Sequence, residues 1–222
     1  MSIVLLVLLV LLCGAGWWSW RALDSHLPPA PTKPHYTIQR FDRVLDEYVS
    51  LGSYTALHRM NTEYPRQTKL LIEDVLELGR VEDPGVENKL RHYYLDSTVQ
   101  VLLDEVHHQF SDLSDLEREF DEAFAKHSKT VPFFRQPHIY AQISCLRQSI
   151  IVSDTLIGIS LDKYLGEDFP LYAEYFTEEQ RSHMNRSAIV EDAVALYMKY
   201  QRELCIRHLQ HGRNFPEYEN PR

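Results

Sequence analysis

The chain has 222 residues, of which 44% are hydrophobic and 25% charged; this composition suits one globular domain and excludes an intrinsically disordered chain. Its net charge of −9 argues against nucleic-acid binding, because neutralising phosphates requires clustered lysine and arginine. The acidic excess indicates a solvated acidic surface. The 11 histidines include only one adjacent pair, so their number alone does not indicate a metal site.

The N-terminal segment is an uncharged apolar run from Ile3 to Trp20, long enough to cross a bilayer. The tryptophans at its end precede Arg21, as in the aromatic belt at a membrane interface. We therefore expect residues 1–22 to form a transmembrane anchor or an uncleaved signal. Two alternatives stay open: cleavage near the small residues 14–16, and acylation at Cys13, which follows leucines rather than a small residue.

A proline-rich stretch, LPPAPTKP at residues 27–34, separates this segment from the rest of the chain. Proline-rich sequences are extended and semi-rigid, so we assign residues 23–40 to a linker that holds the domain away from the bilayer. The domain is expected to span residues 41–212, followed by a tail at residues 213–222.

Most of the domain has the apolar spacing of amphipathic helices. Residues 41–79 are predicted to be helical, with breaks at Gly52 and Pro65. Further helices are predicted over residues 90–110, 113–126 and 187–211, with a capping box at Ser114-x-x-Glu117, a short helix opening at Thr177-x-x-Gln180, and an end at Gly212. The apolar face predicted for the last helix comprises Ile189, Ala193, Leu196, Tyr200 and Leu204.

The strands are predicted in one stretch. His138 to Ser144 alternates apolar and polar side chains, which is the period of a half-buried strand. Two short β-branched segments, at residues 149–152 and 155–159, suit a buried pair joined by a turn at Ser153-Asp154. Leu161 to Gly166 then predicts one helical turn that ends at the glycine.

Two segments carry a family resemblance: DTLIGISLDKYLGEDFPLY at residues 154–172 and NRSAIVEDAV at residues 185–194. They resemble the GldB family, envelope proteins of Bacteroidetes named for gliding motility. The resemblance covers roughly Val99 to Tyr200, and its pattern L-D-K-Y-L-G-x-D-x-P-x-Y is specific. It implies a fold related to zinc peptidases (zincin-like), a periplasmic location for the domain, and other envelope proteins as partners. Members usually carry a lipoprotein cysteine motif, of which this chain has no clear version.

The first candidate metal ligands are histidines on predicted helices. His107 and His108 are adjacent, and adjacent helical side chains point about 100° apart, so the two cannot easily share one ion. A solvated polar face explains this pair better. His208 and His211 are three residues apart; however, two ligands do not make a site, and histidines near a helix C-terminus also interact with its dipole.

The resemblance to zinc peptidases places a further candidate on the last helix. In those enzymes the helix after the strands carries H-E-x-x-H, whose histidines bind zinc and whose glutamate activates water. Here Val190 to Val194 supplies Glu191 and Asp192 but no imidazole. The chain also has no nucleophile-elbow, phosphate-loop or dinucleotide motif. We therefore predict no catalytic, cofactor-binding or metal-binding residue, and no enzyme activity.

Tyrosines and cysteines complete the candidates. The tyrosines of the family-like region are expected mainly in the core, with a tyrosine-lined binding groove as the alternative. Cys145 and Cys205 either form a disulfide in an oxidising compartment or remain small buried hydrophobes. The tyrosines are Tyr140, Tyr164, Tyr172, Tyr175, Tyr197 and Tyr200.

The sequence thus predicts a mostly helical α+β domain with a small sheet of three to four strands, preceded by one transmembrane segment. The resemblance implies a non-catalytic, membrane-tethered component or assembly factor of a gliding-motility-type envelope machine. Two other hypotheses stay open: a metal-dependent peptidase of zincin-like ancestry and a periplasmic binding module.

Overall fold

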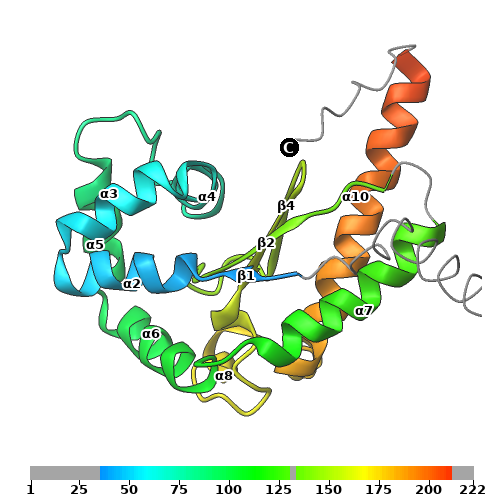
Figure 1. The fold of residues 1–222 in the computed structure, drawn as a ribbon. Coiled ribbons are helices and arrows are strands. Elements are labelled where there is room, and N and C mark those ends of the chain that lie inside the picture. Colours follow the sequence, from blue (N-terminus) through cyan, green and yellow to red (C-terminus); the bar gives the residue numbers. More distant parts are fainter. Residues whose placement is uncertain (1–35, 131–133, 212–222) are drawn as a thin grey trace, which may run out of the picture. The chain divides into compact units, whose positions relative to one another are not determined.

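A small mixed sheet lies at the centre of the computed structural model, which describes residues 36–130 and 134–211 (Figure 1). Three strands run parallel, and the fourth, β3, is antiparallel to β4 at one edge. The predicted α+β class with a small sheet is therefore confirmed. The strands, in their order across the sheet, are β1 (Ile38–Gln39), β2 (His138–Gln142), β4 (Leu156–Ser160) and β3 (Ile150–Ser153).

Helices cover both sides of this sheet (Figure 1). One side carries α2 (Phe41–Leu51), α3 (Tyr54–Thr62), α4 (Pro65–Lys69), the π-helical η1 (Leu70–Val75) and α5 (Val86–Tyr94). The other side carries α7 (Ser114–Thr130) and α10 (Ile189–His211). The remaining elements are α6 (Ser97–Gln109) and the short segments η2 (Leu161–Lys163), α8 (Tyr172–Tyr175), α9 (Glu178–Arg181) and η3 (Arg186–Ala188).

The predictions for residues 1–22 and for Gly212 concern parts of the chain outside the described residues. Within the described ranges, no helix combines the length and apolar composition needed to cross a bilayer. The domain begins before residue 41, because Ile38 of β1 pairs with Ile139 of β2. The end of the predicted linker is therefore part of the sheet, in a strand too short to show a period.

Strand β1 and Tyr36, two residues before it, are also bonded to α7. The Tyr36 N–H donates to the Asp121 carboxylate (2.6 Å), and the Ile38 N–H donates to the Glu117 carboxylate (2.8 Å). The predicted capping box of Ser114 and Glu117 is thus wrong, since Glu117 is used to hold β1. Ser114 instead donates its hydroxyl to Asp112 (2.7 Å).

Two other helix predictions need correction. The stretch 90–110 is two helices, because the Asp96 carboxylate accepts the Thr98 N–H (2.8 Å) and starts α6 there. On α10, Leu196 is 39% exposed, so its predicted position on the apolar face is wrong. The short helix predicted to open at Thr177 is confirmed: it is α9, and Thr177 and Gln180 form a capping box at its start. The buried face of α10 comprises Ile189, Val190, Ala193, Val194 and Tyr197.

Strand β2 is buried on both faces, not half-buried as its alternation predicted. On the face with polar residues, Gln142 Nε2 donates to the Ser160 hydroxyl (3.2 Å), and the ring of Tyr140 lies 6.2 Å from that of Phe41 in α2. The alternation of apolar and polar side chains therefore distinguishes two buried faces of β2, because helices pack on both sides of the sheet.

Gly158 of β4 lies directly opposite Tyr140, and a Cβ at this glycine would stand 2.5 Å from the tyrosine oxygen and 2.6 Å from Cζ. We expect Gly158→Ala to lower the free energy of unfolding by about 1–3 kcal/mol, as overpacking does, measured by chemical denaturation. Tyr140→Leu removes the obstructing ring, so the double variant should be more stable than the sum of the single losses predicts. Simple additivity of the two substitutions would contradict this contact.

Candidate functional site

The segment Leu161–Gly166, which carries the family-like motif, is built around a buried carboxylate. Asp162 accepts backbone N–H groups from Ser144 (2.8 Å) and Leu146 (2.6 Å). These amides flank a left-handed backbone at Cys145 (φ 54°) and Leu146 (φ 65°), which side-chain-bearing residues adopt only when the surroundings hold them there. Burial raises the pKa of Asp162, while the two N–H donors oppose that shift by favouring the carboxylate. Asp162 therefore fixes the turn after β2.

Lys163 and Tyr164 extend the same cluster. Lys163 Nζ donates to the Leu146 carbonyl (3.3 Å) and lies 3.8 Å from the ring centre of Phe176, and burial lowers the pKa of this lysine. The Tyr164 hydroxyl donates to the Asp192 carboxylate (2.9 Å), which lies in the first turn of α10. Consecutive side chains of the motif thus bind the β2–β3 loop and the start of α10.

The last residues of the motif hold the backbone of this segment through hydrogen bonds. The Tyr172 hydroxyl donates to the Asp162 carbonyl (2.6 Å) and accepts the Leu165 N–H (2.9 Å). Gly166 has φ 108°, a conformation that favours glycine, and its N–H donates to the Met184 carbonyl (2.9 Å). Asp162 and Tyr164 of the motif therefore hold structure.

The tyrosines are mainly in the core, as predicted. Tyr140, Tyr164, Tyr172 and Tyr197 are buried, and burial raises the pKa of each hydroxyl. Tyr175 is exposed, and Tyr200 is half-buried and accepts the Asp154 N–H.

The histidine and cysteine candidates whose side chains the structure describes do not assemble. His107 Nδ1 lies 3.2 Å from the Asp46 carboxylate on the surface, and His108 is more exposed. Cys145 and Cys205 are both free thiols. The side chains of His208 and His211 lie outside the described residues. In the described part of the chain, no group of three or more His, Cys, Asp or Glu side chains is placed to hold a metal ion.

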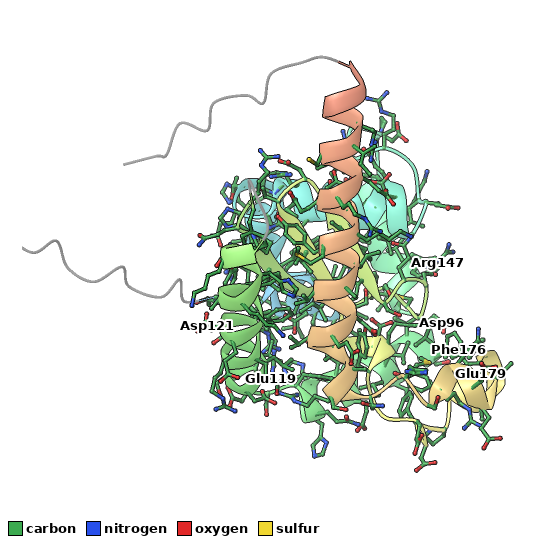
Figure 2. All side chains as sticks on the ribbon, turned by 90° about the vertical axis from the view of Figure 1, so that its right-hand side faces the viewer. Asp96, Glu119, Asp121, Arg147, Phe176 and Glu179 are labelled. Carbon is green, nitrogen blue, oxygen red and sulfur yellow. The ribbon has the colours of Figure 1, made fainter. Side chains whose placement is uncertain are left out.

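A groove of about 660 Å³ lies between α7 and α10. Figure 2 shows this side of the molecule, with α10 in front of the sheet and Glu119 on the neighbouring α7. The alternative of a tyrosine-lined groove is wrong for it, because none of the described tyrosines lines it. The lining residues are Glu119, Glu122, Ala123 and His127 of α7, Ser187 of η3, and Val190, Glu191, Val194, Ala195 and Met198 of α10.

Two contacts hold the helical walls together. Near the start of both helices, the Arg186 guanidinium donates to both carboxylate oxygens of Asp115 (2.9 and 2.6 Å), which lowers the pKa of Asp115. Further along, the rings of Phe124 and Tyr197 meet edge to face with their centres 5.9 Å apart. The groove therefore lies between helices that are joined at two points along their length.

A family model described as gliding motility protein GldB matches residues 28–209. The chain belongs to the GldB family. This membership makes it an envelope protein related to gliding motility, and the match extends beyond the region that carried the resemblance. No curated protein and no solved structure matches the chain.

The sequence of this GldB family member singles out the stretch Val190 to Val194 only as one that lacks metal ligands, and the structure places Val190, Glu191 and Val194 in the lining of the groove. The sequence does not indicate the α7 wall, because Glu119 and Glu122 are ordinary surface residues of an amphipathic helix until α10 is known to lie beside them. No local signal in α7 identifies them.

Asp162→Asn is expected to destabilise the protein by about 1–3 kcal/mol, because an amide nitrogen cannot accept one of the two buried N–H groups. Thermal and chemical denaturation measure the loss. Asp168→Asn, in the same motif but exposed, is the matched control and should leave stability unchanged. Equal stability of both variants would show that the buried carboxylate does not hold the turn.

Proposed function

We propose that this GldB family protein is a non-catalytic, membrane-tethered component or assembly factor of a gliding-motility-type envelope machine, with its domain in the periplasm. Family membership supports the envelope machine. The apolar run Ile3–Trp20 and the proline-rich spacer after it support the tether.

The observation that carries the non-catalytic role is which residues α10 has where a zinc peptidase has its metal ligands. If the fold descends from zinc peptidases, the helix after the strands is where H-E-x-x-H belongs, and Val190 and Val194 stand at the two histidine positions. Both valines are buried, at 7% and 8% exposure, and line the groove. Aliphatic side chains cannot bind zinc, so these residues do not fit the metal.

The two acidic residues of that stretch do not supply a replacement. Glu191 is exposed at the groove, and the Asp192 carboxylate accepts the Tyr164 hydroxyl, so it is committed to holding α10. Carboxylates favour harder ions than zinc, and such ions are poor at generating hydroxide near neutral pH. A groove with an aliphatic floor suits binding better than hydrolysis.

The competing peptidase hypothesis is tested by elemental analysis of the purified protein together with peptide-cleavage assays of the wild type and Glu191→Gln. We expect no stoichiometric zinc and no cleavage in either protein, because α10 offers no imidazole. Stoichiometric zinc, with a cleaving activity that Glu191→Gln removes, would replace our proposal with the enzyme hypothesis.

The tether and the machine are tested by cell fractionation followed by detergent extraction. We expect the full-length protein in the membrane fraction and co-purification with other envelope proteins after mild solubilisation. Recovery in the soluble periplasmic fraction would reject the anchor. Membrane recovery without any co-purifying envelope protein would favour the isolated binding module.

A further inference from the structure

The walls of the α7–α10 groove limit how a ligand is recognised. Lining residues recur at helical spacing on both sides: Glu119, Ala123 and His127 on α7, and Val190, Val194 and Met198 on α10. Backbone N–H and C=O groups inside helices are already paired, so this groove offers no strand edge to which an extended peptide can add. Recognition must therefore run through side chains.

The floor suits a third helix. Ala123 and Ala195 are small, so a ligand backbone can approach closely, and Met198 is flexible enough to adapt to a neighbouring side chain. Val190 and Val194 add aliphatic surface one turn apart. An amphipathic helix fills such a groove with apolar side chains repeating at i, i+3 or i+4, and i+7.

The rim is acidic on both walls. Glu119 and Glu122 on α7 and Glu191 on α10 are exposed, and no lysine or arginine in the described ranges lines the groove. Among the residues that the structure describes, none of these three glutamates forms an ion pair. A bound helix with basic residues beside its apolar row would meet complementary charge.

We propose that the α7–α10 groove binds a basic amphipathic helix of another envelope protein. This inference rests on the proposed function and names the class of partner. The chain's own Ile3–Trp20 run is uncharged and gains nothing from the glutamates. A second copy of the chain, with its net charge of −9, would bring charge of the same sign.

The test uses the full-length protein in detergent micelles and a fluorescent synthetic helix with leucines at i, i+3 or i+4, and i+7 and lysines beside them. A second peptide keeps the leucines but carries glutamates. We expect the lysine peptide alone to bind, and the variant Glu119→Gln/Glu122→Gln to bind it roughly fivefold more weakly at low salt. This difference should shrink at high salt, where surface charges are screened.

Matched variants separate the groove from the general charge of the surface. Glu178→Gln/Glu179→Gln removes two exposed glutamates of α9, away from the groove lining, and should leave binding unchanged. Ala195→Trp fills the floor from an exposed position and should abolish binding. Equal binding of the glutamate peptide, equal weakening by the α9 variant, or no binding of the lysine peptide would overturn the proposal.

A photocrosslinker at Ala195 in intact cells identifies the natural occupant. A product with a lysine- or arginine-rich helix of another envelope protein, lost in Glu119→Gln/Glu122→Gln, supports the proposal. A product with residues 1–35 of the same chain, or with a second copy, overturns it. The α7 glutamates play no part in the peptidase hypothesis. If the peptide-binding and crosslinking tests fail, the proposed function is therefore still decided separately by the zinc analysis and the cleavage assays.

Discussion

The interaction on which the rest of the C-terminal half depends is the pair of hydrogen bonds that Asp162 accepts from Ser144 and Leu146. A buried carboxylate is costly to desolvate, and it persists here because two amides point at it. In return it holds a left-handed turn between β2 and β3 and sets where η2 leaves the sheet. From there Tyr164 reaches Asp192 and positions the start of α10, so the position of the groove depends on a residue that does not line it.

The groove depends on how α7 and α10 pack together on one side of the sheet. Helix α7 is bonded to β1 through Glu117. Helix α10 is joined to α7 by the ring contact of Phe124 and Tyr197, and η3, just before α10, is joined to α7 by the ion pair of Arg186 and Asp115. The α7 wall is therefore fixed to the sheet, and the α10 wall is fixed to α7.

Periodicity in the sequence was enough to predict most helices, the β2–β4 region and the α+β class, because each depends on local spacing of apolar side chains. It failed where burial depends on distant elements. The polar residues of β2 were read as solvent-facing because the pattern does not reveal that α2 covers them, and β1 is too short to have a period. Glu117 was read as a cap because its partner, Ile38, is 79 residues away in the chain. The groove depends on the same kind of information, so only its α10 side could be suggested in advance.

The hydrogen bonds of β1 have a mechanical consequence. The chain enters the domain at Tyr36 and Ile38, and the backbone amides of these two residues are held by Asp121 and Glu117 of α7. Tension applied to the N-terminal side would load these two bonds and the two-residue pairing of β1 with β2 before it reaches the deeper core contacts. Because α7 is one wall of the groove, pulling on the chain at this point would strain the groove wall first.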